Sequence, residues 1–281
     1  MSQAKLTEQD NTQNKKKSKA VFSRSQLCIP YALFLLLFVV FPLMLIIYYA
    51  FTSKTGQFTF ENFVWFFSTD TNIKNLFFSM GLGVVTTVIC LLIGYPVALV
   101  LAKMKSSKKT ILLLLFIMPM WINFVLRAMA MKELLSVLGL FGKYNYLNTV
   151  IGMVYDYLPF MILPLYTTLI KIDKSYEEAA LDLGASPFKV FMSITLPLSL
   201  PGIISGIMMV FLPSMTCYVI SDTFSNGKIL IIGQLIELWF GDGSNWNYGS
   251  TIALIMLVIM YIGMLVSGKF SEDENVRGTN L

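Results

Sequence analysis

The sequence predicts an all-α membrane protein with six transmembrane helices and with both termini in the cytoplasm. Of the 281 residues, 56% are hydrophobic and 13% are charged, whereas soluble domains carry about 25% charged residues. A soluble core could not bury that much apolar surface, so the composition indicates a polytopic membrane protein. Six long apolar runs and an uneven distribution of Lys and Arg between them favour the same fold class.

The six predicted spans are apolar runs of roughly 18 residues or more, the length that a helix needs to cross the hydrocarbon core. They cover approximately residues 28–50, 76–102, 110–131, 150–170, 201–221 and 250–268. The prolines that fall inside them are Pro42, Pro96, Pro119, Pro159, Pro164 and Pro213. Membrane helices tolerate such prolines because neighbouring helices and polar side chains satisfy the freed carbonyl groups. We therefore expect one membrane domain over residues 28–268 and no large soluble domain.

The positions of Lys and Arg predict the orientation of these spans. With a cytoplasmic N-terminus, fifteen of the 21 Lys and Arg residues lie in inner segments and five lie in outer segments. Both termini and the segment 171–200 are therefore expected inside the cell. Residues 1–27 form a basic, polar tail that we expect to be disordered. Residues 269–281 form a second cytoplasmic tail.

Several kinds of chemistry are excluded by what the sequence lacks. It contains no His, and its three cysteines lie within or beside apolar runs, so we expect no metal site and no disulfide framework. No G-x-x-x-x-G-K-[ST] motif is present, and nothing resembles a serine nucleophile elbow. We therefore expect a protein that is not an enzyme, binds no cofactor of its own and has no nucleic acid partner.

The polar stretch "SYEEAALDLGASPFKVFMSITLPLSLPG" (175–202) separates the fourth and fifth spans. Ser175 and Glu178 have the spacing of a capping box, which predicts a short helix that starts there. Gly184 is expected to end that helix in the left-handed conformation, and Pro187 favours the first turn of a second helix. The pattern fits two interpretations, an amphipathic hairpin resting on lipid and a helix–turn–helix that docks on a partner.

The same stretch resembles the EAA signature of ABC-type importer permeases. The spacing of that signature is matched at each position. It begins with Glu178-Ala179-Ala180, continues after three residues with Gly184, and ends after nine further residues with Ile194-Thr195-Leu196-Pro197. The resemblance implies a type I ABC importer permease (MetI-like) fold and a coupling loop within 171–200 that docks on a cytoplasmic ATPase. The implied coupling residues are Glu178, Ala179, Ala180, Gly184, Pro187 and Phe188. Two roles remain open for Glu178, a contact with a basic group of the ATPase and the cap of its own helix.

Three longer stretches are similar to the spermidine/putrescine permeases, in particular to the first of their two permease chains: residues 118–136, 155–186 and 212–240. This resemblance implies half of a translocation pathway for polyamines in a bacterial cytoplasmic membrane. The implied partners are a second permease, two ATPase subunits that hold ATP and Mg, and an extracytoplasmic binding protein. The alternatives are an ABC permease for another small solute (iron, thiamine or an anion) and an ion-coupled secondary transporter.

Polar and aromatic residues within the spans and in the adjoining outer segment are the candidates for the substrate pathway, because polar groups at membrane depth are costly and tend to be functional. A polyamine needs carboxylates for its ammonium groups and aromatic faces for its methylene chain. The candidates are Asp156, Tyr155, Tyr157, Trp121, Asn123, Asp222 and Glu237. A second interpretation of Asp156 is a structural charge pair with Arg127, and Trp and Tyr near span ends also serve as interface anchors.

Overall fold

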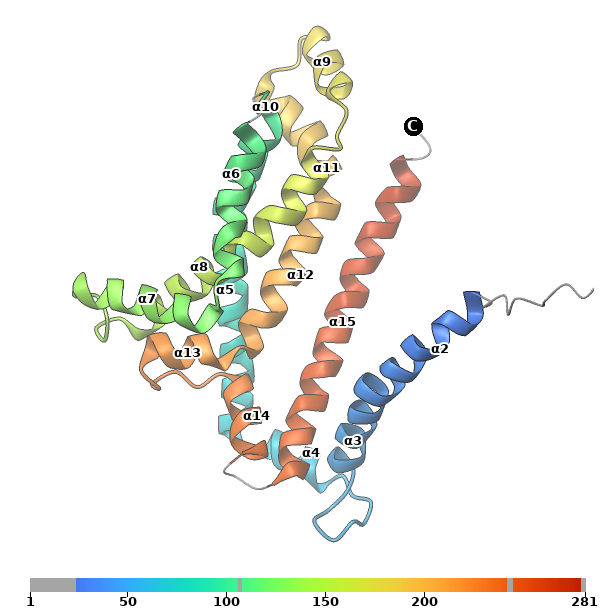
Figure 1. The fold of residues 1–281 in the computed structure, drawn as a ribbon, viewed down its shortest axis with the longest axis vertical. Helices are drawn as coiled ribbons and strands as arrows, with labels where there is room; N and C mark the ends of the chain where they lie inside the picture. Colours follow the sequence, from blue (N-terminus) through green and yellow to red (C-terminus); the bar gives the residue numbers. More distant parts are fainter. Residues whose placement is uncertain (1–23, 106–107, 242–244, 279–281) are drawn as a thin grey trace, which may run out of the picture. The chain divides into compact units, whose positions relative to one another are not determined.

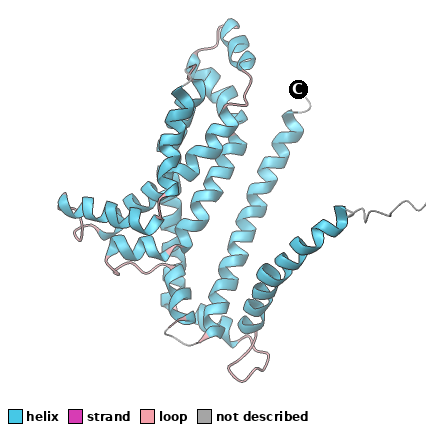
Figure 2. Cartoon of the chain, viewed as in Figure 1, coloured by secondary structure: helices cyan, strands magenta, loops and turns pink. Residues whose placement is uncertain are grey.

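The computed structural model describes residues 24–105, 108–241 and 245–278, and helices make up most of these residues (Figure 2). The predicted all-α class is confirmed. Residues 1–23 of the predicted N-terminal tail and residues 279–281 of the C-terminal one lie outside the described residues. Contacts divide the chain into two units, residues 1–46 and 47–281.

The described part of the first unit is a single apolar helical segment. It consists of α2 (Arg24–Leu35), a π-helical turn η1 (Leu36–Val40) and the beginning of α3 (Phe41–Ala50). The π-turn leads into Pro42, whose ring is incompatible with a regular bond to the carbonyl of Phe38. Residues 29–50 are long and apolar enough to cross a membrane, in the place of the first predicted span.

Three helices form the core of the second unit: α5 (Asp70–Lys103), α8 (Asn145–Leu169) and α12 (Leu200–Thr216). Each packs against the other two (Figure 1). Leu82, Met161 and Val210 contribute one buried side chain from each helix to this core. In lipid such packing depends on close approach of the helices, and glycines provide it here.

Gly152 of α8 allows a similar close approach to a fourth helix, because a side chain at this position would collide with the ring of Phe224 in α13 (Tyr218–Ser225). We expect Gly152→Ala to lower the amount of folded protein and its thermal stability, measured in detergent extracts. Gly81→Ala is the matched control, since Gly81 lies within α5 with open space around it. That control should be neutral or slightly stabilising, because Ala favours a helix over Gly by about 0.8–1 kcal/mol. Equal stability of the two variants would contradict the packing.

The third predicted span is not one continuous helix. It consists of α6 (Lys108–Ile117), a 3₁₀ turn η2 (Met118–Trp121) and α7 (Phe124–Val137), and the two long pieces are bent by 98°. Ile122 is extended, and the Asn123 side chain accepts a hydrogen bond from the Val125 N–H, which starts a new helix. Apolar composition alone does not locate such a break, since the two pieces together are long and apolar enough to count as one span.

The fifth predicted span also differs from the structure at its end. Its helix, α12, stops at Thr216, and the chain continues as α13 and then α14 (Ile232–Phe240). A side chain at Gly233 would collide with the carbonyl oxygen of Thr216, so the start of α14 lies directly against the end of α12. The helix α13 packs on α7 and α8 instead of extending α12 (Figure 1).

The last helix, α15 (Trp246–Gly278), packs on α14, α12 and α4 (Glu61–Ser68). Asn247 of α15 donates to the carbonyls of Tyr49 and Thr52 at 3.0 and 2.6 Å. Asn62 of α4 donates to Thr52 as well, at 2.9 Å. These buried amides satisfy carbonyl groups left free where α3 ends.

The segment between α8 and α12 contains four short helices: α9 (Lys174–Asp182), α10 (Pro187–Val190), a π-helical turn η3 (Phe191–Thr195) and α11 (Leu196–Leu198). Figure 1 shows α9 and α10 at one end of the core helices, and α4 and α14 at the other end. Counting each bent pair as one span, the described residues provide up to six candidate spans.

Candidate functional site

The turn after α9 has the geometry that its sequence predicts. Gly184 has a φ of +82°, and its N–H donates to the carbonyl of Leu181 at 2.9 Å. The N–H of Ala185 donates to the carbonyl of Ala180 at 3.0 Å. These two bonds form a Schellman motif, which satisfies the carbonyls at the end of the helix. The left-handed conformation predicted for Gly184 is confirmed.

The predicted capping box at the start of α9 is wrong. Asp173 is the N-cap, and its carboxylate accepts a hydrogen bond from the Ser175 N–H at 3.0 Å. This hydrogen bond lowers the pKa of Asp173. A carboxylate is favoured over a hydroxyl here because its charge complements the positive helix N-terminus. Ser175 lies inside the helix, so Glu178 is not needed for a cap.

The predicted coupling residues surround the exposed end of this segment. Glu178 and Ala179 are exposed, and among the described residues Glu178 has no hydrogen-bond or ion-pair partner. Pro187 and Phe188 begin α10, and the Phe188 side chain is 70% exposed. Among the predicted coupling residues, Glu178 therefore offers an exposed carboxylate and Phe188 an exposed large apolar side chain to a partner.

Glu177 makes polar contacts with Lys103 and Thr195 that were not predicted from the sequence. Its Oε2 accepts a hydrogen bond from Lys103 Nζ at 2.9 Å, and its Oε1 accepts one from the Thr195 hydroxyl at 2.7 Å. Partial burial alone would raise the pKa of Glu177, but the hydrogen bonds from Lys103 and Thr195 lower it below its ordinary value. The carboxylate is therefore charged at neutral pH.

The sequence contains one indication that Glu177 and Glu178 have different surroundings. Consecutive helical residues point about 100° apart, so Glu177 and Glu178 project in different directions from α9. The pattern does not reveal that Lys103 and Thr195, which are distant in the sequence, lie beside Glu177.

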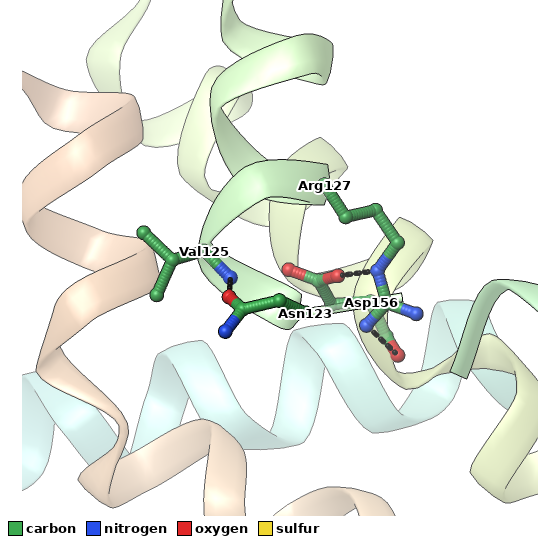
Figure 3. A network of polar contacts seen from close by, with 4 residues as sticks. All are labelled: Asn123, Val125, Arg127 and Asp156. Atoms are coloured by element: carbon green, nitrogen blue, oxygen red, sulfur yellow. Dashed lines mark hydrogen bonds and ion pairs between the residues drawn. The ribbon is translucent and has the colours of Figure 1, made fainter. Parts of the chain in front are cut away.

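A buried ion pair joins α7 to α8. Arg127 Nε donates to Asp156 Oδ1 at 2.5 Å, and the side chains are 6% and 2% exposed (Figure 3). The guanidinium also lies over the ring of Tyr155, 5.7 Å from its centroid. Asp156 Oδ2 and Arg127 Nη1 are buried, and neither has a hydrogen-bond partner in the described part of the chain. The contact required by the charge-pair hypothesis is thus present.

Beside this ion pair lies a pocket of about 460 Å³ between η2, the start of α7, α8, α12 and α13. The candidates that line it are Trp121, Asn123, Asp156 and Tyr157, together with Arg127. The Trp121 side chain is 77% exposed, and the Tyr157 hydroxyl donates to the Pro213 carbonyl at 3.4 Å. Residues from the third, fourth and fifth predicted spans therefore meet in one place.

The remaining candidates lie outside the lining of this pocket. Asp222 is exposed on α13, and Glu237 is exposed on α14. Tyr155 contacts Arg127 from α8 without lining the pocket. In the described residues, no group of three His, Cys, Asp or Glu side chains is arranged to hold a metal ion. The pocket combines a carboxylate oxygen with aromatic surface, a combination suited to a small organic cation.

Comparisons with known proteins agree on one family. A family model described as "Binding-protein-dependent transport system inner membrane component" matches residues 91–272. The spermidine/putrescine transport system permease protein PotB of Haemophilus influenzae is 36% identical over 83% of this chain and 88% of its own length. PotB of Escherichia coli is 33% identical over 86% of this chain and 95% of its own length.

A solved structure shows the same fold. It is the crystal structure of a bacterial alginate ABC transporter in complex with an alginate pentasaccharide-bound periplasmic protein. One chain of that structure matches the present chain with a TM-score of 0.69. The match covers 88% of this chain and 93% of that chain, at 14% identity.

Proposed function

The chain belongs to the family of binding-protein-dependent transport system inner membrane components, and we propose that it forms half of the translocation pathway of an ATP-driven importer of spermidine and putrescine. It is a multi-pass inner membrane protein and a transport subunit rather than an enzyme. The substrate class is supported by the two PotB relatives, whose names state spermidine and putrescine.

The single structural observation that carries this function is the pocket beside Asp156. The Oδ2 atom of Asp156 is buried without a partner among the described residues, and a side-chain movement that opens it to the pocket provides an acceptor for a substrate ammonium group. The exposed Trp121 ring can cover a methylene segment. Arg127 offsets the negative charge of Asp156 and bonds to its Oδ1. The site is therefore able to hold a cation weakly enough for release, as passage through a membrane requires.

The remaining parts of the importer are supplied by partners. A second permease completes the pathway, an extracytoplasmic binding protein delivers the substrate, and two cytoplasmic ATPase subunits bind ATP and Mg. This chain itself binds neither ATP nor Mg. The Lys and Arg distribution supports a cytoplasmic position for α9, and the exposed Glu178 and Phe188 side chains are available there to contact the ATPase. Closure of the ATPase pair moves α9, and the core helices change their arrangement in response.

An anion is the second candidate substrate, because Arg127 Nη1 is also without a partner at the same pocket. An anionic solute would bind this guanidinium group and displace Asp156 from it. Competition between the two classes of solute separates the candidates.

Transport by the intact complex tests the proposal. The complex is purified through an affinity tag on this chain, reconstituted into liposomes and supplied with its binding protein. We expect ATP-dependent uptake of radiolabelled spermidine that excess putrescine inhibits and that molybdate, thiamine and ferric citrate do not. A complex that hydrolyses ATP and accumulates one of these other solutes, with no uptake of spermidine, would refute the polyamine assignment and leave the permease role intact.

A further inference from the structure

We propose that Glu177 is a positioning residue that fastens α9 to α5 and to η3, so that movement of α9 reaches the membrane helices. This inference rests on the proposed coupling role of α9. Glu178, which belongs to the EAA signature, is exposed and has no ion-pair partner among the described residues, whereas the carboxylate of Glu177 is bonded within the chain.

The helix α9 is poorly supported by packing. None of its residues is buried. A pocket of about 240 Å³ lies beneath it, lined by apolar side chains of α5 and α8, which include Leu99 and Leu169. A helix with an open space beneath it can tilt without moving its neighbours. A specific contact is therefore needed if its movement is to be transmitted.

The carboxylate of Glu177 provides this contact with both of its oxygens. Lys103 is the last residue of α5, and its ammonium group lies 2.9 Å from Oε2. Thr195 ends η3, is 1% exposed, and donates to Oε1 at 2.7 Å. A single side chain thus joins three elements, and both hydrogen bonds are charge-assisted, the stronger class in proteins.

The helix α5 holds the same region at a second point. The Tyr95 hydroxyl lies 2.9 Å from Ser199 Oγ, and Ser199 Oγ donates to the Leu196 carbonyl at 2.8 Å, so Tyr95 is the donor to Ser199. Ser199 is buried at the 62° bend between the residue 187–198 segment and α12. Tyr95 and Lys103 lie about two helical turns apart on α5. The unbroken α5 therefore holds the bend through Tyr95 and α9 through Lys103.

Neighbouring glutamates thus have separate tasks. Glu178 is exposed and available to a partner, while the Glu177 side chain is 21% exposed and used within the chain. If Glu177 is removed, the ATPase should still bind α9, but α9 should move independently of α5 and η3. If Glu178 is removed, binding of the ATPase itself should weaken.

The test is Glu177→Gln in the reconstituted complex, because glutamine keeps the size of the side chain and removes its charge. We expect normal protein levels and normal co-purification of the ATPase, and about a tenfold drop in substrate transported per ATP hydrolysed, from the lost charged hydrogen bonds. The exchange Glu177→Lys with Lys103→Glu should recover part of this ratio. Lys105→Met is the matched control, since Lys105 lines the same pocket but forms no ion pair among the described residues.

A second measurement does not depend on the substrate or on transport. A nitroxide attached through Tyr176→Cys, on the exposed face of α9, in a chain without its native cysteines, should become more mobile with Glu177→Gln and not with Lys105→Met. Unchanged label mobility together with a wild-type transport ratio would overturn the inference. Loss of the ATPase from Glu177→Gln would overturn it as well, because Glu177 would then act in binding. Failure of spermidine uptake by the unmodified complex would refute the proposed substrate but not the label result.

Discussion

Replacement of Gly184 by valine is expected to reduce transport more than tenfold while the protein remains in the membrane. Gly184 has a φ of +82°, and an L-residue in the left-handed region costs roughly 1–2 kcal/mol, more when it is β-branched. No atom lies within 4 Å of a Cβ at this position, so the effect arises from the backbone and not from a collision. The turn should open, and α9 and α10 should lose the relative orientation that we propose for contact with the ATPase. The measurement is uptake and ATP hydrolysis by the reconstituted complex.

Two controls isolate the backbone effect. Gly184→Asn should retain most of the activity, because asparagine tolerates the left-handed conformation. Gly139→Val introduces the same strain at the end of α7, where φ is +68° and the space around the residue is also open. It should have a smaller effect on the ratio of transport to ATP hydrolysis. Normal coupling in Gly184→Val would show that this turn does not position α9 for the ATPase.

Asp156→Asn is expected to have the second large effect, through the buried pair with Arg127. Breaking such a pair by removing one partner commonly costs about 3–5 kcal/mol, because the remaining charge is left buried and uncompensated. We therefore expect a marked loss of protein from the membrane, measured by quantitative immunoblotting. The double variant Arg127→Gln with Asp156→Asn should restore the protein level, since neither residue is then charged.

The double variant also separates the structural role of Asp156 from its role in the pathway. If Asp156 Oδ2 binds the substrate, the restored complex should assemble and hydrolyse ATP but transport little spermidine. If the pair is only structural, uptake should return together with the protein level. A wild-type protein level in Asp156→Asn alone would show that the ion pair contributes little to folding, and wild-type uptake would remove Asp156 from the pathway.

The fold class followed from the sequence because its determinants are local. An apolar run of sufficient length dictates a helix in lipid, where every backbone group must be satisfied within the segment. The left-handed conformation of Gly184 was equally predictable, because only the adjacent residues define the end of a helix. The EAA spacing identified the family, which the match over residues 91–272 confirmed.

The start of α9 shows where local reasoning failed. Two local patterns competed, the Ser175–Glu178 box and the Asp173 cap, and the structure contains the second. The choice between them changes the interpretation of Glu178, which is left free for a partner.

Tertiary structure alone decided which residues meet. The sequence left two interpretations of Asp156 open, a pathway residue and a pair with Arg127. Only the structure shows that the pair forms and that Trp121 lines the same pocket, beside the 98° bend that redirects α7 across α8. Glu177 contacts Lys103 and Thr195 because α5, α9 and η3 converge at one end of the core helices. Such contacts join residues up to 74 positions apart. The side-chain pattern of a single helix specifies which face is apolar, but not which distant residue packs against that face. The pocket and the Glu177 contacts could therefore be identified only from the three-dimensional structure.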